Sequence, residues 1–230
     1  MEPTPTTAEL TRYLSSTHRV VVLGGLAVIS HGLSRVTHDA DCWLDPTISI
    51  EDWCNAVKDL LVKWARLRLV SIGNWSEMPP ADLAGYIEDF GVVRVLGATQ
   101  PFDIFRRPNE MEVSGFEEVW ERATPLTDGT RLPDVVDLLI TKQDTGRPRD
   151  TYDIQFLEGK AEEMYLERLP KASSGEALKM LERFLNPKVA AAAAAHSDPK
   201  VRETGMKFLR ELADAGDPFA RDLLAAVGGA

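Results

Sequence analysis

The sequence predicts an α/β (α+β) protein in which helices flank a small mixed β-sheet and a helical region follows. Short runs rich in β-branched and aromatic residues occur at 19–23, 91–97 and 101–105, each bounded by glycine, proline or a turn. Residues 53–67 and most of the chain after Pro133 instead carry apolar residues at helical spacing. We therefore expect a sheet-containing domain over residues 1–169 and a helical C-terminal region over 170–230.

The composition is that of a globular chain with a marked acidic balance. Apolar residues make up 44% of the 230 residues, charged residues 27%, and the formal net charge is −10. Such a chain does not coat nucleic acid non-specifically, although a local basic patch stays possible. Two cysteines form neither a disulfide framework nor a metal-knuckle pattern. No apolar run reaches the length of a membrane span, and the first residues do not resemble a signal peptide, so we expect a cytoplasmic protein without membrane partners.

Each predicted element has a local reason. The buried strand at 19–23 ends at Gly24-Gly25, and helical spacing resumes at Leu26. Strict alternation over 39–45 indicates a strand with Asp39, Asp41 and Trp43 on one face.

The later elements follow the same logic. Ser49 begins a long amphipathic helix, whereas residues 81–90 fit either a helix or a strand. Asn or Asp followed by Pro, as at 186–187, 198–199 and 217–218, predicts three helix starts in the C-terminal region.

Gly24-Gly25 has two interpretations. Glycines between a strand and a helix let a bulky anion approach the backbone, and a helix N-terminus favours phosphate. A tight turn also uses glycine simply for packing. The Gly-Lys-Ser/Thr continuation of a P-loop is missing here, so that motif is excluded.

Three aspartates form the second candidate feature. Asp39 and Asp41 project from the same strand face, where two carboxylates repel unless a cation lies between them, and a hard divalent metal is the usual cation. The alternative is a solvated strand face. Asp103 stands in the apolar strand 101–105, where an unpartnered carboxylate is unfavourable. If the three meet, they complete a two-metal site for phosphoryl chemistry, with Asp103 binding the metal near the nucleophile.

These residues, in this order, resemble the nucleotidyltransferase superfamily with the DNA polymerase β-like fold. The stretch GGLAVISHGLSRVTHDADCWLD looks most like small bacterial members related to the AbiEii abortive-infection toxins, the type IV toxin–antitoxin enzymes. A second segment, Lys142 followed by GRPRDTYDI, is similar to their Lys…Arg-x-x-Asp-x-x-Asp segment. The resemblance spans roughly residues 19–157 and does not reach the tail after 170.

The resemblance implies transfer of NMP from an NTP to a hydroxyl, with Mg²⁺ or Mn²⁺ and release of pyrophosphate. It assigns the metals to Asp39, Asp41 and Asp103, the triphosphate to Gly24 and Gly25, and a phosphate or nucleotide contact to Lys142. Where other members have Gly-Ser, this chain has Gly-Gly, so the phosphate-positioning hydroxyl is missing. By family analogy the acceptor is an RNA 3′ end, such as that of tRNA, or a protein hydroxyl. A toxin–antitoxin role with a cognate antitoxin would follow.

Several neighbouring residues keep two interpretations. Arg35 and Thr37 either contact phosphate or cap the loop and form a salt bridge. Trp43 either stacks on a base or packs in the interior. Asp150 and Asp153 either orient Lys142 or Arg147 or are ordinary surface charge, and we favour the structural role.

Two other functions compete with the enzyme. The fold could serve as a catalytically silent module that binds nucleotide or a protein partner through its helical tail. Three clustered carboxylates argue against this, because a silent module has no need to tolerate them. A drug-modifying nucleotidyltransferase is the third alternative, although no acidic pocket for a cationic drug can be read from the sequence.

Overall fold

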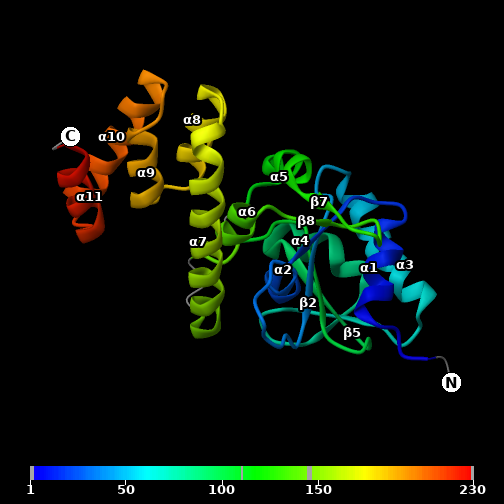
Figure 1. The fold of residues 1–230 in the computed structure, drawn as a ribbon. Coiled ribbons are helices and arrows are strands. Elements are labelled where there is room, and N and C mark those ends of the chain that lie inside the picture. Colours follow the sequence, from blue (N-terminus) through cyan, green and yellow to red (C-terminus); the bar gives the residue numbers. More distant parts are fainter. Residues whose placement is uncertain (1–2, 110, 144–146, 229–230) are drawn as a thin grey trace. The chain divides into compact units, whose positions relative to one another are not determined.

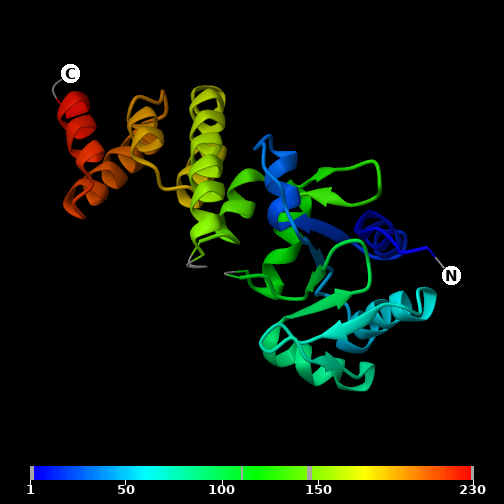
Figure 2. The ribbon, with the colours of Figure 1, turned by 90° about the horizontal axis from the view of Figure 1, so that it is seen from below.

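The computed structural model describes residues 3–109, 111–143 and 147–228, which form the mixed α/β architecture expected from the sequence (Figures 1 and 2). The strands are β1 (Val20–Leu23), β2 (Ala40–Leu44), β3 (Arg68–Val70), β4 (Glu77–Met78), β5 (Val92–Leu96), β6 (Phe102–Phe105), β7 (Thr124–Pro125) and β8 (Arg131–Leu132). The helices are α1 (Thr7–Ser15), α2 (Gly24–Ser30), α3 (Ile50–Lys63), α4 (Leu83–Phe90), α5 (Phe116–Arg122), α6 (Val135–Ile140), α7 (Pro148–Arg168), α8 (Ser174–Arg183), α9 (Pro187–Ala194), α10 (Pro199–Asp214) and α11 (Pro218–Gly228).

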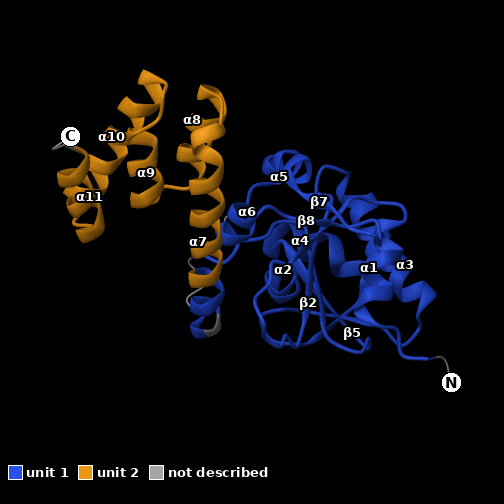
Figure 3. Ribbon diagram, viewed as in Figure 1, with its two compact units in different colours: residues 1–154 blue, residues 155–230 orange. Residues whose placement is uncertain are grey.

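The chain divides into two compact units, residues 1–154 and 155–230, which Figure 3 colours separately. Unit 1 contains the sheet, whose eight strands run in the order β4-β3-β5-β6-β2-β1-β8-β7. Pairing is parallel between β2 and β6 and between β1 and β8, and antiparallel elsewhere. The sheet is therefore mixed, as predicted.

The two faces of the sheet differ in chemistry because side chains alternate along each strand. One face packs against α1, α3 and α4 and forms the main core, to which β2 contributes Ala40, Cys42 and Leu44. The other face carries a smaller apolar cluster that includes Trp43 and Phe116. The predicted carboxylates lie on this second face, outside the main core.

Residues 81–90, which the sequence left open, contain helix α4. Its apolar residues Leu83 and Ile87 are four positions apart and both buried, so they form one inward face. The helix ends at Gly91, whose φ of +69° is the left-handed cap that glycine adopts most easily.

Unit 2 consists of helices whose starts follow the predicted signals. The side chains of Asn186 and Asp198 accept hydrogen bonds from backbone amides in the first turns of α9 and α10, and proline follows each. A Cβ on Gly205 of α10 would lie 2.6 Å from the Ala194 backbone nitrogen. The alanine run and this glycine therefore allow α9 and α10 to pack closely. Among the described residues, no helix is long and apolar enough to cross a membrane.

Candidate functional site

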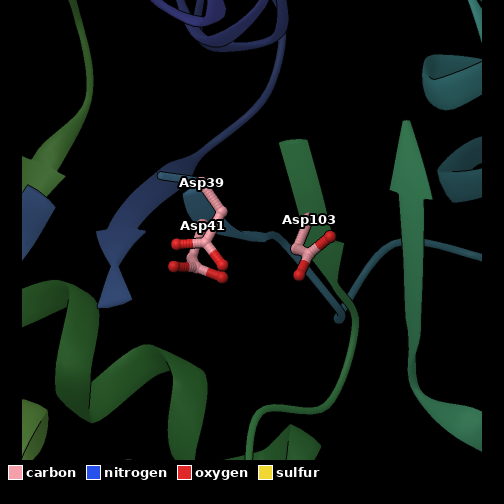
Figure 4. A group of neighbouring side chains, drawn as sticks. All are labelled: Asp39, Asp41 and Asp103. Carbon is pink, nitrogen blue, oxygen red and sulfur yellow. The ribbon is translucent and has the colours of Figure 1, made fainter. Parts of the chain in front are cut away.

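Strand register brings the three aspartates together. Asp41 of β2 is the pairing partner of Asp103 in the parallel β6, and Asp39 directly precedes β2. One oxygen from each carboxylate lies within 4.8 Å of the others, and Figure 4 shows the three side chains around a common space. The meeting that the sequence analysis inferred from order and resemblance is therefore present in the folded chain.

Burial and neighbouring negative charge perturb the carboxyl groups of Asp41 and Asp103. Burial, followed by the charges of Asp103 and Asp39, raises the pKa of Asp41 from its usual 3.8 to about 7. Burial also raises the pKa of Asp103, although Arg94 acts in the opposite direction. A cation held between the carboxylates would relieve this repulsion, and oxygen ligands suit Mg²⁺ or Mn²⁺.

Arg94 of β5 is a site residue that the sequence analysis did not identify. It pairs in register with Asp103, and its Nε and Nη2 donate to the two oxygens of that carboxylate, each at 2.6 Å. The same guanidinium lies 3.8 Å from Asp39 Oδ2. A signal was present, because this arginine interrupts an apolar strand next to the strand that Asp103 interrupts.

The two glycines make room for site side chains. Gly24 has φ +59°, and a Cβ there would overlap the Asp41 carboxylate. A Cβ on Gly25 would overlap the Thr37 hydroxyl and lie 2.8 Å from Arg35 Nη2. Helix α2 begins at Gly24 itself and has only 7 residues. The packing interpretation of the glycine pair is thus supported directly, and a triphosphate contact remains an expectation.

Arg35 and Thr37 both contact acidic groups. Thr37 Oγ1 donates to Asp39 Oδ1 at 3.2 Å, and Arg35 Nη2 donates to Asp153 Oδ2 at 2.7 Å. These contacts match the capping and salt-bridge interpretation. They also place a hydroxyl and a guanidinium beside the glycine turn.

Lys142 takes part in a largely buried ionic cluster. Its Nζ lies 2.9 Å from Asp153 Oδ2 and 3.2 Å from Asp150 Oδ1. Asp153 is fully buried, so the ammonium and the Arg35 guanidinium compensate its charge together. Of the roles that the sequence left open for the two aspartates, these contacts match the orientation of Lys142, and the phosphate contact of Lys142 remains a prediction.

A cavity of about 590 Å³ brings together every site residue that the sequence predicted. The glycine backbone, the carboxylates and the arginine and lysine side chains all line this one cavity. A substrate with a charged end requires such a combination. The predicted residues in its wall are Gly24, Gly25, Arg35, Thr37, Asp39, Asp41, Asp103 and Lys142.

Trp43 does not belong to this cavity. Although it shares the strand face of Asp39 and Asp41, it is fully buried, and its ring meets Phe116 edge to face at 5.0 Å. Its indole nitrogen donates to the Arg106 carbonyl at 3.1 Å. Of the two interpretations of Trp43, interior packing is correct and base stacking is wrong.

Comparison with known proteins gives little further information. No protein-family model matches the chain, and no curated protein matches it significantly. A solved structure from H. pylori, described as a candidate nucleotidyltransferase, aligns over 96% of this chain and 92% of its own. The identity is 15% and the TM-score 0.38, too low for this likeness to support a conclusion about function.

Proposed function

We propose that this protein is a metal-dependent nucleotidyltransferase that moves NMP from an NTP to a hydroxyl acceptor and releases pyrophosphate. One observation carries the proposal. Asp39, Asp41 and Asp103 converge in a cavity whose wall also contains the glycine turn and several arginine and lysine side chains. The sequence resemblance, which rests partly on the same residues, supports the same activity. The domain expected to perform it is residues 1–169, with 170–230 outside it.

The three carboxylates fit a divalent cation. Their oxygens lie within 4.8 Å of one another, and hard oxygen donors match Mg²⁺ or Mn²⁺. When bound, such a cation supplies Lewis-acid stabilisation of the reacting phosphate and a more acidic attacking hydroxyl. The raised pKa of Asp41 has the same implication, because a cation favours the charged carboxylate that burial disfavours.

The remaining side chains supply binding and orientation. Arg35, Arg94 and Lys142 line the cavity and present positive charge to a triphosphate. Gly24 and Gly25 keep the turn open for the Asp41 carboxylate and the Arg35 guanidinium. Asp103, which the sequence analysis assigns to the metal near the nucleophile, would accept the proton of the attacking hydroxyl.

The acceptor and the biological role belong to the same proposal. An RNA 3′ hydroxyl, as in tRNA, or a protein hydroxyl is the expected acceptor. A toxin–antitoxin function with a cognate antitoxin rests on the sequence resemblance alone.

Label transfer tests the activity. The protein is incubated with each α-labelled NTP, Mg²⁺ or Mn²⁺, and either bulk tRNA or cell extract. Wild type should label RNA or protein, and the Asp39→Asn/Asp41→Asn variant should not. The matched control is Asp82→Asn/Asp89→Asn, which removes two exposed carboxylates outside the cavity wall. Equal or absent labelling in wild type and the Asp39/Asp41 variant would refute transfer to these acceptors.

One observation favours the silent-module alternative. Arg94 already compensates Asp103 with two short hydrogen bonds, so the cluster tolerates its charge without a metal. In that case, nucleotide should bind equally well with and without a divalent cation, and no label should be transferred. Isothermal titration with and without Mn²⁺ distinguishes the two functions.

A further inference from the structure

Trp75 lies on the turn between β3 and β4 in an unfavourable backbone conformation. Its φ is +61°, and it is the one residue other than glycine with a positive φ in the described part of the chain. A bulky residue rarely adopts the left-handed region without a compensating reason. The side chain is nevertheless 58% exposed, so burial of its ring does not supply that reason.

The turn is built to hold this conformation. Asn74 Oδ1 accepts hydrogen bonds from the Ser76 amide at 3.0 Å and the Ser76 hydroxyl at 2.6 Å, and from the Ser71 hydroxyl. The Trp75 amide donates to the Ser71 carbonyl at 3.2 Å, and the Ser71 amide to the Ser76 carbonyl at 2.9 Å. These bonds hold the backbone of the turn in this conformation, while the indole remains in contact with solvent.

The indole is directed at the candidate site. Its ring centroid lies 4.4 Å from the Arg94 guanidinium carbon, and that guanidinium holds both oxygens of Asp103. Trp75 is thus separated from the carboxylate cluster by a single side chain. Ile72 of the same turn lines the cavity.

Trp75 contacts the cavity through Arg94, and other exposed apolar side chains line the cavity itself. Among the described residues, seven large hydrophobic side chains are exposed, and two of them, Val36 and Tyr152, line the cavity. They are 75% and 76% exposed. The cavity wall also carries Arg35, Lys142 and Arg147. A ligand with an anionic part and a flat apolar part matches this combination, and a nucleotide has both.

We propose that Trp75, backed by Arg94, is a stacking platform for a nucleobase beside the carboxylate cluster. This inference rests on the proposed function and adds to it the residue that holds the base. Aromatic rings stack on any base, and an arginine over the second ring face strengthens such contacts. The base belongs either to the NTP or to the end of an RNA acceptor, since both present the same flat surface.

Equilibrium binding tests the platform without requiring turnover. The probes are a fluorescent non-hydrolysable NTP and a labelled short single-stranded RNA, each with Mn²⁺. Trp75→Ala should weaken at least one probe on the order of 5- to 100-fold, the usual loss for one stacked base. Trp75→Phe, which keeps a ring, should restore most of the affinity. The probe that weakens identifies the source of the base.

Two further variants make the test specific. Trp75→Gly accepts the left-handed backbone, so the turn is kept while the ring is lost, and affinity should fall as in Trp75→Ala. The matched control is Phe90→Ala, which removes an aromatic side chain that is 57% exposed and stacked on Tyr86. This control should bind both probes as wild type does.

The outcomes separate this inference from the proposed function. If Trp75→Ala and Trp75→Gly bind every probe that wild type binds with unchanged affinity, the platform is refuted and the proposed function stands. If wild type binds neither probe, both are refuted. If Trp75→Ala loses affinity and Trp75→Gly does not, the effect comes from the turn, and the stacking role is likewise refuted.

Discussion

Replacing Asp41 by asparagine should make the metal-free protein more stable at alkaline pH. The folded state raises the pKa of Asp41 from 3.8 to about 7, so the folded chain binds more protons than the unfolded chain between these values. The free energy of unfolding therefore falls as the pH rises from about 4 to about 7, and the loss is complete above that range. Asparagine has nearly the same shape and removes this penalty.

The magnitude follows from the two pKa values. The interval from 3.8 to about 7 corresponds to at most about 4 kcal/mol at pH 8. The carboxylate is enclosed, but the residue as a whole is partly exposed to the cavity, so solvent screening reduces this figure. We expect about 2 kcal/mol, which raises the melting temperature by roughly 4–8 °C.

Thermal melts of Asp41→Asn and wild type at pH 8 and pH 5, without divalent metal, measure the effect. The gain should be largest at pH 8 and shrink as the pH falls. Asp89→Asn, an exposed carboxylate on α4, is the control and should show no gain. If the melting temperature of Asp41→Asn at pH 8 is equal to or below that of wild type, the charged Asp41 carboxylate does not destabilise the folded protein, and the reasoning is refuted.

Three further predictions concern the surrounding contacts. Arg94→Met should lower the melting temperature in metal-free buffer, because breaking its buried ion pair with Asp103 costs about 3–5 kcal/mol. The same variant should bind Mn²⁺ more tightly in calorimetric titration, because Asp103 is no longer held by the arginine. Mn²⁺ should raise the melting temperature of wild type by binding the folded protein. Gly24→Ala should abolish this rise, because its Cβ would overlap the Asp41 carboxylate. An unchanged rise would contradict this packing role. Asp153→Asn should destabilise unit 1 in urea unfolding by about 3 kcal/mol and weaken NTP binding, since Lys142 loses one of its two carboxylate partners. Wild-type stability would show that this cluster is not a structural ion pair.

The sequence predicted the strands of the site better than the contacts within it. Strict alternation over 39–45 placed Asp39 and Asp41 on one face and left the apolar side chains for the core, as the structure confirms. Such patterns are local and can be read along the chain. Pairing of β2 with β6 is not local, so the meeting of Asp41 with Asp103 could be inferred only from order and resemblance.

The residues missed by the sequence analysis are those whose role depends on a distant partner. In the sequence, Arg94 is a single charged residue in an apolar strand. Its role as the partner of Asp103 becomes visible only from the pairing of β5 with β6. Trp75 stands in a polar turn without periodicity, and its left-handed backbone leaves no mark in the sequence. The sequence left two interpretations of Trp43 open, because the face of a strand does not reveal what covers it.

The parallel pairing of β2 with β6 has a consequence for how the chain folds. Asp41 and Asp103 are register partners separated by α3, α4 and three strands, so closing this pair requires a long loop to lose its conformational freedom. A shift of either strand by one residue would turn the carboxylate of that strand toward the apolar core. Metal affinity should therefore appear late in refolding, after the central strands have settled. During synthesis, a chain that does not yet include residues 102–105 would have no cluster, so any reactive site must wait until β6 has paired with β2.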